Sequence, residues 1–398
     1  MKNIAFTIVA QNYLGYALTL YKSMCESNGN IDFRIYVADG LDESVRDKIS
    51  AEYPVELVDA LTISPDLFLK MGFYYDVTEY CTSIKPFVIN SLFIEGYDKV
   101  CYIDPDIYVY KNLTEPVLNY LDSYSIFLTP HICSPIKDDK IPNEQIHLFS
   151  GTYNLGFLAV KNDETSNSFI QWWMDKCRDE CFFDPAKGLF VDQKWINLVP
   201  GLFANVYISR HLGLNVAYWN LHERFVSAGK IDNYDLIFYH FSGIDVNNIE
   251  KISKYQNRYN LSDRMDIKNL FLEYAELVKS NLATIGDLPP YRFFKYKNEA
   301  VISLIARRLY FSHQNDFSSP FESIEKSEVF INFLRSKGIY EKSISNEIKD
   351  KKIANDRIEK LNSIIKLLIR LIGPYRYQSL VKAFRYLSSL STIQQIYK

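Results

Sequence analysis

The chain has 398 residues, a formal net charge of −3 and a hydrophobic content of 47%. Its length exceeds that of one typical domain, so we expect a sizeable core with one additional region. The nearly balanced charge excludes bulk electrostatic capture of nucleic acid, and nucleic acid is not an expected partner. The six cysteines form neither a CxxC pair nor a secreted framework, which favours reduced thiols in a cytoplasmic protein.

The first part of the chain alternates strand-like and helix-like segments. Apolar runs at 4–10 and 33–38 flank a helical pattern at 14–25, which predicts a β-α-β unit. The further predicted elements are a helix at 42–53, strands at 55–58 and 99–103, a helix at 78–93 perturbed by Pro86, strands at 125–129 and 152–160, and a Trp-rich helix at 167–181. This alternation predicts an α/β fold with a mainly parallel sheet.

The carboxyl ends of such strands are where ligands bind in open α/β sheets. Asn12, Tyr13 and Asp39 follow the first two predicted strands, and an acidic pair follows Ile103. We therefore expect all of them at one functional edge.

The sequence changes character from about Asn247, where it becomes polar and helix-rich without strand candidates. We place a boundary near Lys254 and predict three regions: a core at 1–254, a helical extension at 255–345 and a basic amphipathic tail at 346–398. Gly373-Pro374 divides the last stretch into two helices, and no acidic side chain follows Glu359. Two interpretations of this tail stay open: contact with an anionic membrane surface, and a helical pair packed on the core. No apolar run approaches the roughly 20 residues that a spanning helix needs.

The strongest chemical signal is the sequence Cys101-Tyr-Ile-Asp-Pro-Asp-Ile-Tyr-Val109. Asp104 and Asp106 end an apolar strand, so both carboxylates can face a hard divalent cation that leaves positions open for phosphate oxygens. The same Asp-Pro-Asp pattern also occurs in ordinary turns. Further segments decide between the two interpretations.

Three later segments add chemistry in chain order: Ser150–Phe157, Phe190–Trp195 and His240–Gly243. His240 follows an apolar strand at 236–239 and could complete a mixed oxygen and nitrogen site of the kind that Mn²⁺ accepts. The neutral amides of Asn154 and Gln193 suit sugar hydroxyls. Asp192 either acts with them or caps a helix that starts near Lys194.

The order of these segments, over roughly residues 1–256, resembles the retaining glycosyltransferases with the GT-A fold, in particular the glycogenin and lipopolysaccharide galactosyltransferase family. The resemblance implies that Asp104, Asp106 and His240 are the metal ligands and that Asp104 also lies near the ribose. It implies that Gly243 makes a close backbone contact to the diphosphate.

The resemblance also assigns the remaining donor contacts. Asn12 and Tyr13 would lie at the nucleoside and Lys85 near the donor, while Asn154 and the catalytic pair Asp192-Gln193 would hold the donor sugar beside its anomeric carbon. Two positions depart from the family pattern: Ala10 replaces an acidic residue that reads uracil, and Val246 replaces a diphosphate-binding lysine, for which Lys251 or Lys254 could substitute.

The segment 215–224 is dense in aromatic and polar groups. Tyr218, Trp219, His222 and Glu223 are candidates for an acceptor or donor pocket, and ordinary core packing is the alternative interpretation.

These observations predict a Mn²⁺- or Mg²⁺-dependent glycosyltransferase that moves a sugar from a nucleotide-sugar, a UDP-sugar, to a glycan or lipid-linked acceptor such as a lipopolysaccharide or capsule precursor, with retention. We expect it in the cytoplasm, or at the inner face of the cell membrane. The alternative is a catalytically silent sugar-nucleotide-binding protein attached to the membrane surface. A phosphatase of the haloacid dehalogenase type is disfavoured, because Tyr108 stands where that family has Thr or Val.

Overall fold

The computed structural model describes residues 1–340, 364–365 and 367–388. Within these residues the chain forms two compact units: residues 1–68 with 77–292, and residues 69–76 with the chain from Phe293 onward. The first unit carries the sheet and every candidate site residue predicted from the sequence.

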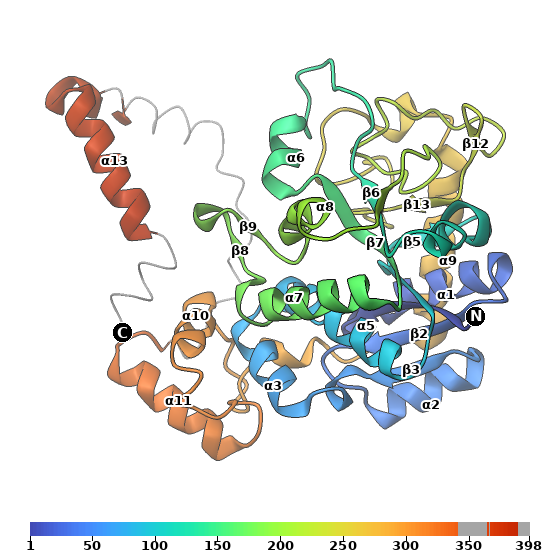
Figure 1. Ribbon diagram of the computed structural model, residues 1–398. Helices are drawn as coiled ribbons and strands as arrows, with labels where there is room; N and C mark the ends of the chain where they lie inside the picture. Colours follow the sequence, from blue (N-terminus) through green and yellow to red (C-terminus); the bar gives the residue numbers. More distant parts are fainter. Residues whose placement is uncertain (341–363, 366, 389–398) are drawn as a thin grey trace. The chain divides into compact units, whose positions relative to one another are not determined.

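A seven-stranded sheet forms the centre of the first unit (Figure 1). In spatial order its strands are β10 (Val206–Ile208), β6 (Ile126–Pro130), β7 (Tyr153–Lys161), β4 (Lys99–Ile103), β1 (Asn3–Val9), β2 (Asp32–Val37) and β3 (Glu56–Asp59). All neighbours pair in parallel except β7, which runs antiparallel to both β4 and β6. The prediction of an α/β fold with a mainly parallel sheet is therefore confirmed.

Short two-stranded ribbons accompany the main sheet. They pair β5 (Ile107–Val109) with β13 (Phe238–His240), β8 (Phe183–Asp184) with β9 (Leu189–Phe190), and β11 (Lys230–Ile231) with β12 (Tyr234–Asp235). The first of these ribbons matters most for the site, because its strands begin just after the acidic pair and end at the predicted histidine.

Helices cover the sheet on both faces, which explains why the central strands are continuously apolar. Along β1, Val9 packs with Ile35, Leu14 and Leu18 on one face, whereas the ring of Phe6 contacts those of Tyr36 and Tyr102 on the other. The helices of the first unit are α1 (Leu14–Ser27), α2 (Glu43–Glu52), α4 (Val77–Ser83), α5 (Lys85–Ile94), α6 (Glu144–Ser150), α7 (Glu164–Glu180), α8 (Val199–Leu202) and α9 (Lys268–Ile285); α3 (Pro65–Tyr74) begins in this unit and ends in the other.

The helical segment predicted at 78–93 is two helices rather than one. α4 ends at Ser83, and α5 begins at Lys85 with Pro86 in its first turn. Proline is tolerated there because the first N–H groups of a helix have no intrahelical acceptor. The break brings the side chain of Lys85 to the start of a helix, where it becomes part of the site.

The first unit extends to Arg292, well past the boundary that we predicted near Lys254. The reason is α9, which packs on α1 through a polar network and a close apolar contact. Asn281 accepts a hydrogen bond from Lys22 Nζ (2.8 Å) and donates to Thr19 Oγ1 (2.8 Å), and a Cβ on Gly15 would lie 2.5 Å from Leu282 Cδ2. Helix-rich sequence therefore begins within the first compact unit.

The second unit contains α10 (Leu304–Ser312) and α11 (Ile324–Ser336), together with the segment Leu69–Asp76. Arg307 of α10 is buried, and its guanidinium donates to four backbone carbonyls, those of Gly72, Phe73, Tyr75 and Phe293. These bonds attach the segment from residues 69–76 to the helices of the same unit.

The predicted division of the tail at Gly373-Pro374 is confirmed in the residues that the structure covers. Residues 367–372 are helical, Gly373 has a φ of +79°, and α13 (Pro374–Ser388) follows. The first part of the predicted tail, residues 346–363, and its last ten residues lie outside the described residues. None of the helices in the described ranges combines the length and the hydropathy that a transmembrane span requires.

Candidate active site

The two aspartates after β4 and the histidine that ends β13 meet at one point. β13 pairs antiparallel with β5, and this register sets His240 opposite Ile107, the residue after Asp106. His240 Nε2 lies 2.9 Å from Asp106 Oδ1 and 3.6 Å from Asp104 Oδ2. One ligand atom from each of the three residues lies within 4.8 Å of the other two.

This donor set fits a divalent cation. Carboxylate oxygens suit Mg²⁺ and Mn²⁺, and an imidazole nitrogen is accepted more readily by the latter. Asp104 and Asp106 are partly exposed, so a ligand can reach a cation between them, whereas His240 is buried. Burial by itself would lower the pKa of His240, but the charges of Asp106 and Asp104 outweigh that effect and raise it.

Gly156 lets the histidine reach this position. A Cβ at residue 156 would lie 2.3 Å from His240 Cε1 and 2.8 Å from Asn154 Oδ1, both far inside van der Waals contact. The carbonyl of Gly156 accepts a hydrogen bond from the backbone N–H of Asp104 (2.7 Å). The glycine of the Asn154-Leu155-Gly156 segment is therefore required by the close approach of His240, one of the predicted metal ligands, and of the Asn154 amide.

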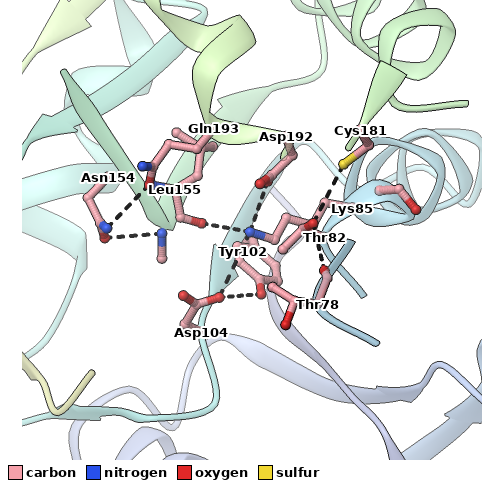
Figure 2. Close-up of polar contacts among 12 residues, drawn as sticks. Thr78, Thr82, Lys85, Tyr102, Asp104, Asn154, Leu155, Cys181, Asp192 and Gln193 are labelled. Atoms are coloured by element: carbon pink, nitrogen blue, oxygen red, sulfur yellow. Dashed lines mark hydrogen bonds and ion pairs between the residues drawn. The ribbon is translucent and has the colours of Figure 1, made fainter. Parts of the chain in front are cut away.

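A buried ion pair between Lys85 and Asp192 lies beside Asp104, as Figure 2 shows. Lys85 Nζ lies 3.0 Å from Asp192 Oδ2 and 3.9 Å from Asp104 Oδ1, and it donates to the carbonyl of Leu155 (3.0 Å). Burial alone would lower the pKa of Lys85, but Asp192 and Asp104 raise it, so the ammonium stays charged. Tyr102 donates a 2.5 Å hydrogen bond to the same Asp104 oxygen.

The alternative interpretation of Asp192 as a helix cap is wrong. A 3₁₀ helix does begin after it, at Gln193–Leu198, but the Asp192 side chain makes no capping hydrogen bond. Its carboxylate is instead paired with Lys85 in a position that is 2% exposed. Burial raises the pKa of Asp192, and the lysine opposes this.

The amides of Asn154 and Gln193 are held in fixed orientations (Figure 2). Gln193 Oε1 accepts from the backbone N–H of Leu155 (3.0 Å), and its Nε2 donates to the carbonyl of Ser150 (3.0 Å). Asn154 Oδ1 accepts from the N–H of Gly156 (3.1 Å) and from Asn215 Nδ2 (3.2 Å). Both amides line a pocket of about 480 Å³.

The four weaker pocket candidates separate into two places. Tyr218 and Trp219 line the same pocket as Asn154 and Gln193. His222 and Glu223 line a different cavity, of about 350 Å³. The Glu223 carboxylate accepts twice from the backbone N–H of Cys133 (2.9 and 3.1 Å), so in this structure it holds a loop.

The predicted nucleoside and phosphate residues lie at the first strand end and after His240. Asn12 and Tyr13 belong to a 3₁₀ turn (Gln11–Tyr13), are both exposed, and the Tyr13 ring stacks on that of Tyr16 at 4.1 Å. Gly243 has a φ of +72°, and its carbonyl accepts from the N–H of Lys254 (3.0 Å).

The departure at Val246 also has a structural reason. This side chain is buried in a hydrophobic cluster, where a lysine could not be accommodated without a partner. The ammonium of Lys254 lies over the ring of Tyr255, a residue that lines the pocket. Of the two lysines considered as substitutes, Lys254 therefore has an observed link to the site.

Two histidines of the pocket were missed by the sequence analysis. His131 follows β6 directly and could have been found by the rule that strand ends carry ligands, whereas His147 lies in α6 without any motif around it. His131 Nε2 lies 3.2 Å from Asn154 Nδ2, and its ring centroid is 5.1 Å from that of His147.

Comparisons with known proteins found relatives in sequence and in structure. No family model matches the chain. The uncharacterized protein YfnF of Bacillus subtilis (strain 168) is 27% identical over 303 residues, which cover 74% of this chain and 97% of that protein.

Glycosyltransferases are among the solved structures found to be similar. The galactosyltransferase LgtC, solved in complex with donor and acceptor sugar analogs, matches 69% of this chain and 95% of its own at 15% identity and a TM-score of 0.45. GlyE from Streptococcus pneumoniae TIGR4 matches 78% and 72% at 16% identity and a TM-score of 0.42. At such identities and scores, function has to be inferred from the residues of the site itself.

Proposed function

We propose that the chain is a metal-dependent glycosyltransferase that moves a sugar from a nucleotide-sugar donor to a glycan or lipid-linked acceptor. The observation that carries this proposal is the cluster of Asp104, Asp106 and His240, whose ligand atoms lie within 4.8 Å of one another. It lies next to a pocket lined by the fixed amides of Asn154 and Gln193. A cation site that adjoins a hydroxyl-binding pocket is what a transferase of this class needs.

In this proposal each group has a distinct task. A bound Mn²⁺ or Mg²⁺ supplies positive charge that stabilises the departing diphosphate. Asn154 and Gln193 hold the donor sugar through its hydroxyls, because their amides are pre-oriented by backbone contacts. Asp192 and Lys85 hold Asp104 in place and set the electrostatic field around it.

Retention of anomeric configuration fits this arrangement. A reaction in which the acceptor attacks on the face that the diphosphate leaves depends on positioning and charge stabilisation, and a dedicated base is not required. The donor base proposed here is uracil, and Tyr13 with Asn12 would flank it at the end of β1. The cytoplasmic location stays a prediction.

We also propose that the C-terminal helix touches an anionic membrane surface. In α13 the side chains of Leu380 and Phe384, about one helical turn apart, are both exposed. The helix also carries Arg376 and Lys382, and its sequence contains no acidic residue. Exposed aromatic and basic side chains on one helix are typical of peripheral membrane contact.

The decisive test is release of nucleoside diphosphate from a panel of nucleotide-sugars with Mn²⁺, with Mg²⁺ and with EDTA. We expect metal-dependent release from one donor in the wild type and in Asp139→Asn, a matched control at a 91% exposed carboxylate. Asp106→Asn should lose that release while remaining folded.

The opposite result would favour the alternative function. If no donor is consumed but a nucleotide-sugar raises the melting temperature in the presence of Mn²⁺, the chain is a silent sugar-nucleotide-binding protein. If no donor is consumed and none shifts the melting temperature, both functions fail.

A further inference from the structure

The two carboxylate oxygens of Asp104 have different surroundings (Figure 2). Oδ1 accepts a 2.5 Å hydrogen bond from the hydroxyl of Tyr102 and lies 3.9 Å from Lys85 Nζ. Oδ2 lies 3.6 Å from His240 Nε2, which belongs to another of the predicted metal ligands. One oxygen is therefore bound by a hydroxyl of the chain itself, and the other lies on the side of the remaining predicted ligands.

The sheet and its packing fix the position of Tyr102. This residue belongs to β4, and the strand pairing continues to Asp104, whose N–H donates to the carbonyl of Gly156 (2.7 Å). Residues two apart in an extended chain point to the same face, so the tyrosine side chain can reach the carboxylate. Tyr102 is 2% exposed, and its ring centroid lies 5.3 Å from that of Phe6. The ammonium of Lys85 lies 4.3 Å from the same centroid, so the ring has contacts that hold its hydroxyl in one direction.

The hydroxyl has a different effect on Asp104 from that of the lysine. An ammonium contributes positive charge, which opposes a cation bound nearby. A hydroxyl carries no charge, so it can orient the carboxylate without neutralising it. Hydrogen-bond partners of metal ligands fix the orientation of those ligands, and the loss of one typically lowers metal affinity about 10- to 100-fold.

The engaged oxygen also affects which cation the site prefers. Ca²⁺ takes a variable number of oxygen ligands and accepts carboxylates through one oxygen or both, whereas the smaller Mg²⁺ requires nearly octahedral geometry. Mn²⁺ takes oxygen ligands and accepts the imidazole nitrogen that His240 offers. A carboxylate that offers a single oxygen therefore disfavours the larger cation.

We propose that Tyr102 is a positioning residue for the metal. By holding Oδ1, it leaves Asp104 to bind the cation through Oδ2 alone, and it thereby favours Mn²⁺ or Mg²⁺ over Ca²⁺. This inference rests on the cation site of the proposed function.

Metal binding can be measured without donor or turnover, because the electron paramagnetic resonance of Mn²⁺ reports the free aqueous ion. The full-length chain is titrated with Mn²⁺, and Ca²⁺ is then added as a competitor. Tyr102→Phe keeps the ring and removes the hydroxyl, so we expect it to bind Mn²⁺ at least about tenfold more weakly. Ca²⁺ should lose less, because the released Oδ1 can serve it as a second ligand. The ratio of Mn²⁺ to Ca²⁺ affinity should therefore fall at least about threefold.

The matched control is Tyr97→Phe. Tyr97 is 3% exposed, and its hydroxyl donates to the carboxylate of Asp32 (3.1 Å), which is not one of the predicted metal ligands. This variant loses a bond of the same kind and should bind both cations like the wild type. Urea unfolding of both variants shows that each is folded under the conditions of the titration.

Two results with folded Tyr102→Phe would overturn the proposal. One is an unchanged affinity for Mn²⁺. The other is an equal loss for Mn²⁺ and Ca²⁺, because a structural defect without any effect on the oxygens of Asp104 weakens both cations alike. If Tyr102→Phe does not fold, the wild type decides: Ca²⁺ should bind at least about tenfold more weakly than Mn²⁺, and equal affinities would refute coordination through one oxygen.

The same titrations separate this inference from the proposed function. If the two cations behave as expected but no nucleotide-sugar is consumed, the transferase function fails and the role of Tyr102 stands. If a donor is consumed and Tyr102→Phe binds both cations like the wild type, the transferase stands and the role of Tyr102 fails. If the wild type binds no Mn²⁺, both fail.

Discussion

Replacing Lys85 by methionine should destabilise the first unit more than any single change at its surface. The ammonium is 2% exposed and lies 3.0 Å from Asp192 Oδ2, whose side chain is equally buried. Removing it leaves a carboxylate in the interior without a counter-charge. Breaking a buried pair in this way typically costs about 3–5 kcal/mol, a large share of the 5–15 kcal/mol that holds a typical domain folded.

A double-variant cycle isolates the pair. In Lys85→Met/Asp192→Leu no buried charge is left unpaired, so we expect the double variant to recover at least about 2 kcal/mol relative to Lys85→Met. The control is Lys176→Met, which breaks a partly exposed pair with Glu180 and a cation–π contact with Trp195 and should cost no more than about 1 kcal/mol.

Urea unfolding at pH 7, followed by near-UV circular dichroism, reports on this region because the indole of buried Trp173 donates to the carbonyl of Asp192. The reasoning is refuted if Lys85→Met costs no more than Lys176→Met. It is also refuted if the double variant is as unstable as the sum of the two single variants, because the charges would then not be coupled.

Three further predictions address other parts of the chain. Gly156→Ala should weaken Mn²⁺ binding at least about tenfold in calorimetry, since the new Cβ would overlap the imidazole of His240, whereas Gly201→Ala, with open space around it, should bind normally. His147 takes up a proton below about pH 6.5 in the unfolded chain, but only below about pH 4 in the folded chain. The free energy of unfolding should therefore decrease by up to about 3 kcal/mol as the pH is lowered from 6.5 to 4. In His147→Phe, urea unfolding should show a smaller decrease across the same window. Arg307→Met leaves four backbone carbonyls without their hydrogen-bond donor and should destabilise the second unit by about 3 kcal/mol or more. Amide hydrogen exchange should then become faster at residues 293–340 and stay unchanged in the sheet.

Local pattern was enough to predict the elements that carry the acidic pair. Strand β4 has the predicted bounds, 99–103, because an uninterrupted apolar run that ends in Asp-Pro-Asp has few other structures available. The direction of β7 could not be predicted in the same way. A buried strand is apolar on both faces whether it runs parallel or antiparallel, so sequence alone leaves its direction open.

Pairings between segments that are distant in the sequence could not be predicted either. Lys85 was placed near the donor by resemblance, but its partner Asp192 had a local explanation as a helix cap that only the fold rules out. His147 carries no motif, and both its place in a pocket wall and its two covered ring nitrogens without a partner among the described residues follow only from the packing. Burial and missing partners are properties of the packed chain.

The reversed strand is what assembles the site. In a purely parallel sheet, the strand next to β4 would bring its carboxyl end to the edge where Asp104 lies. β7 instead runs antiparallel to β4, with Ile103 paired to Phe157. The amino end of β7, which contains Asn154 and Gly156, therefore lies at the edge where Asp104 lies. The first residues of β7 thus lie beside the segment that follows β4, and Gly156 among them leaves room for His240 from the β5–β13 ribbon. The predicted metal ligands and the amide proposed to hold sugar hydroxyls thus become neighbours through one change of strand direction.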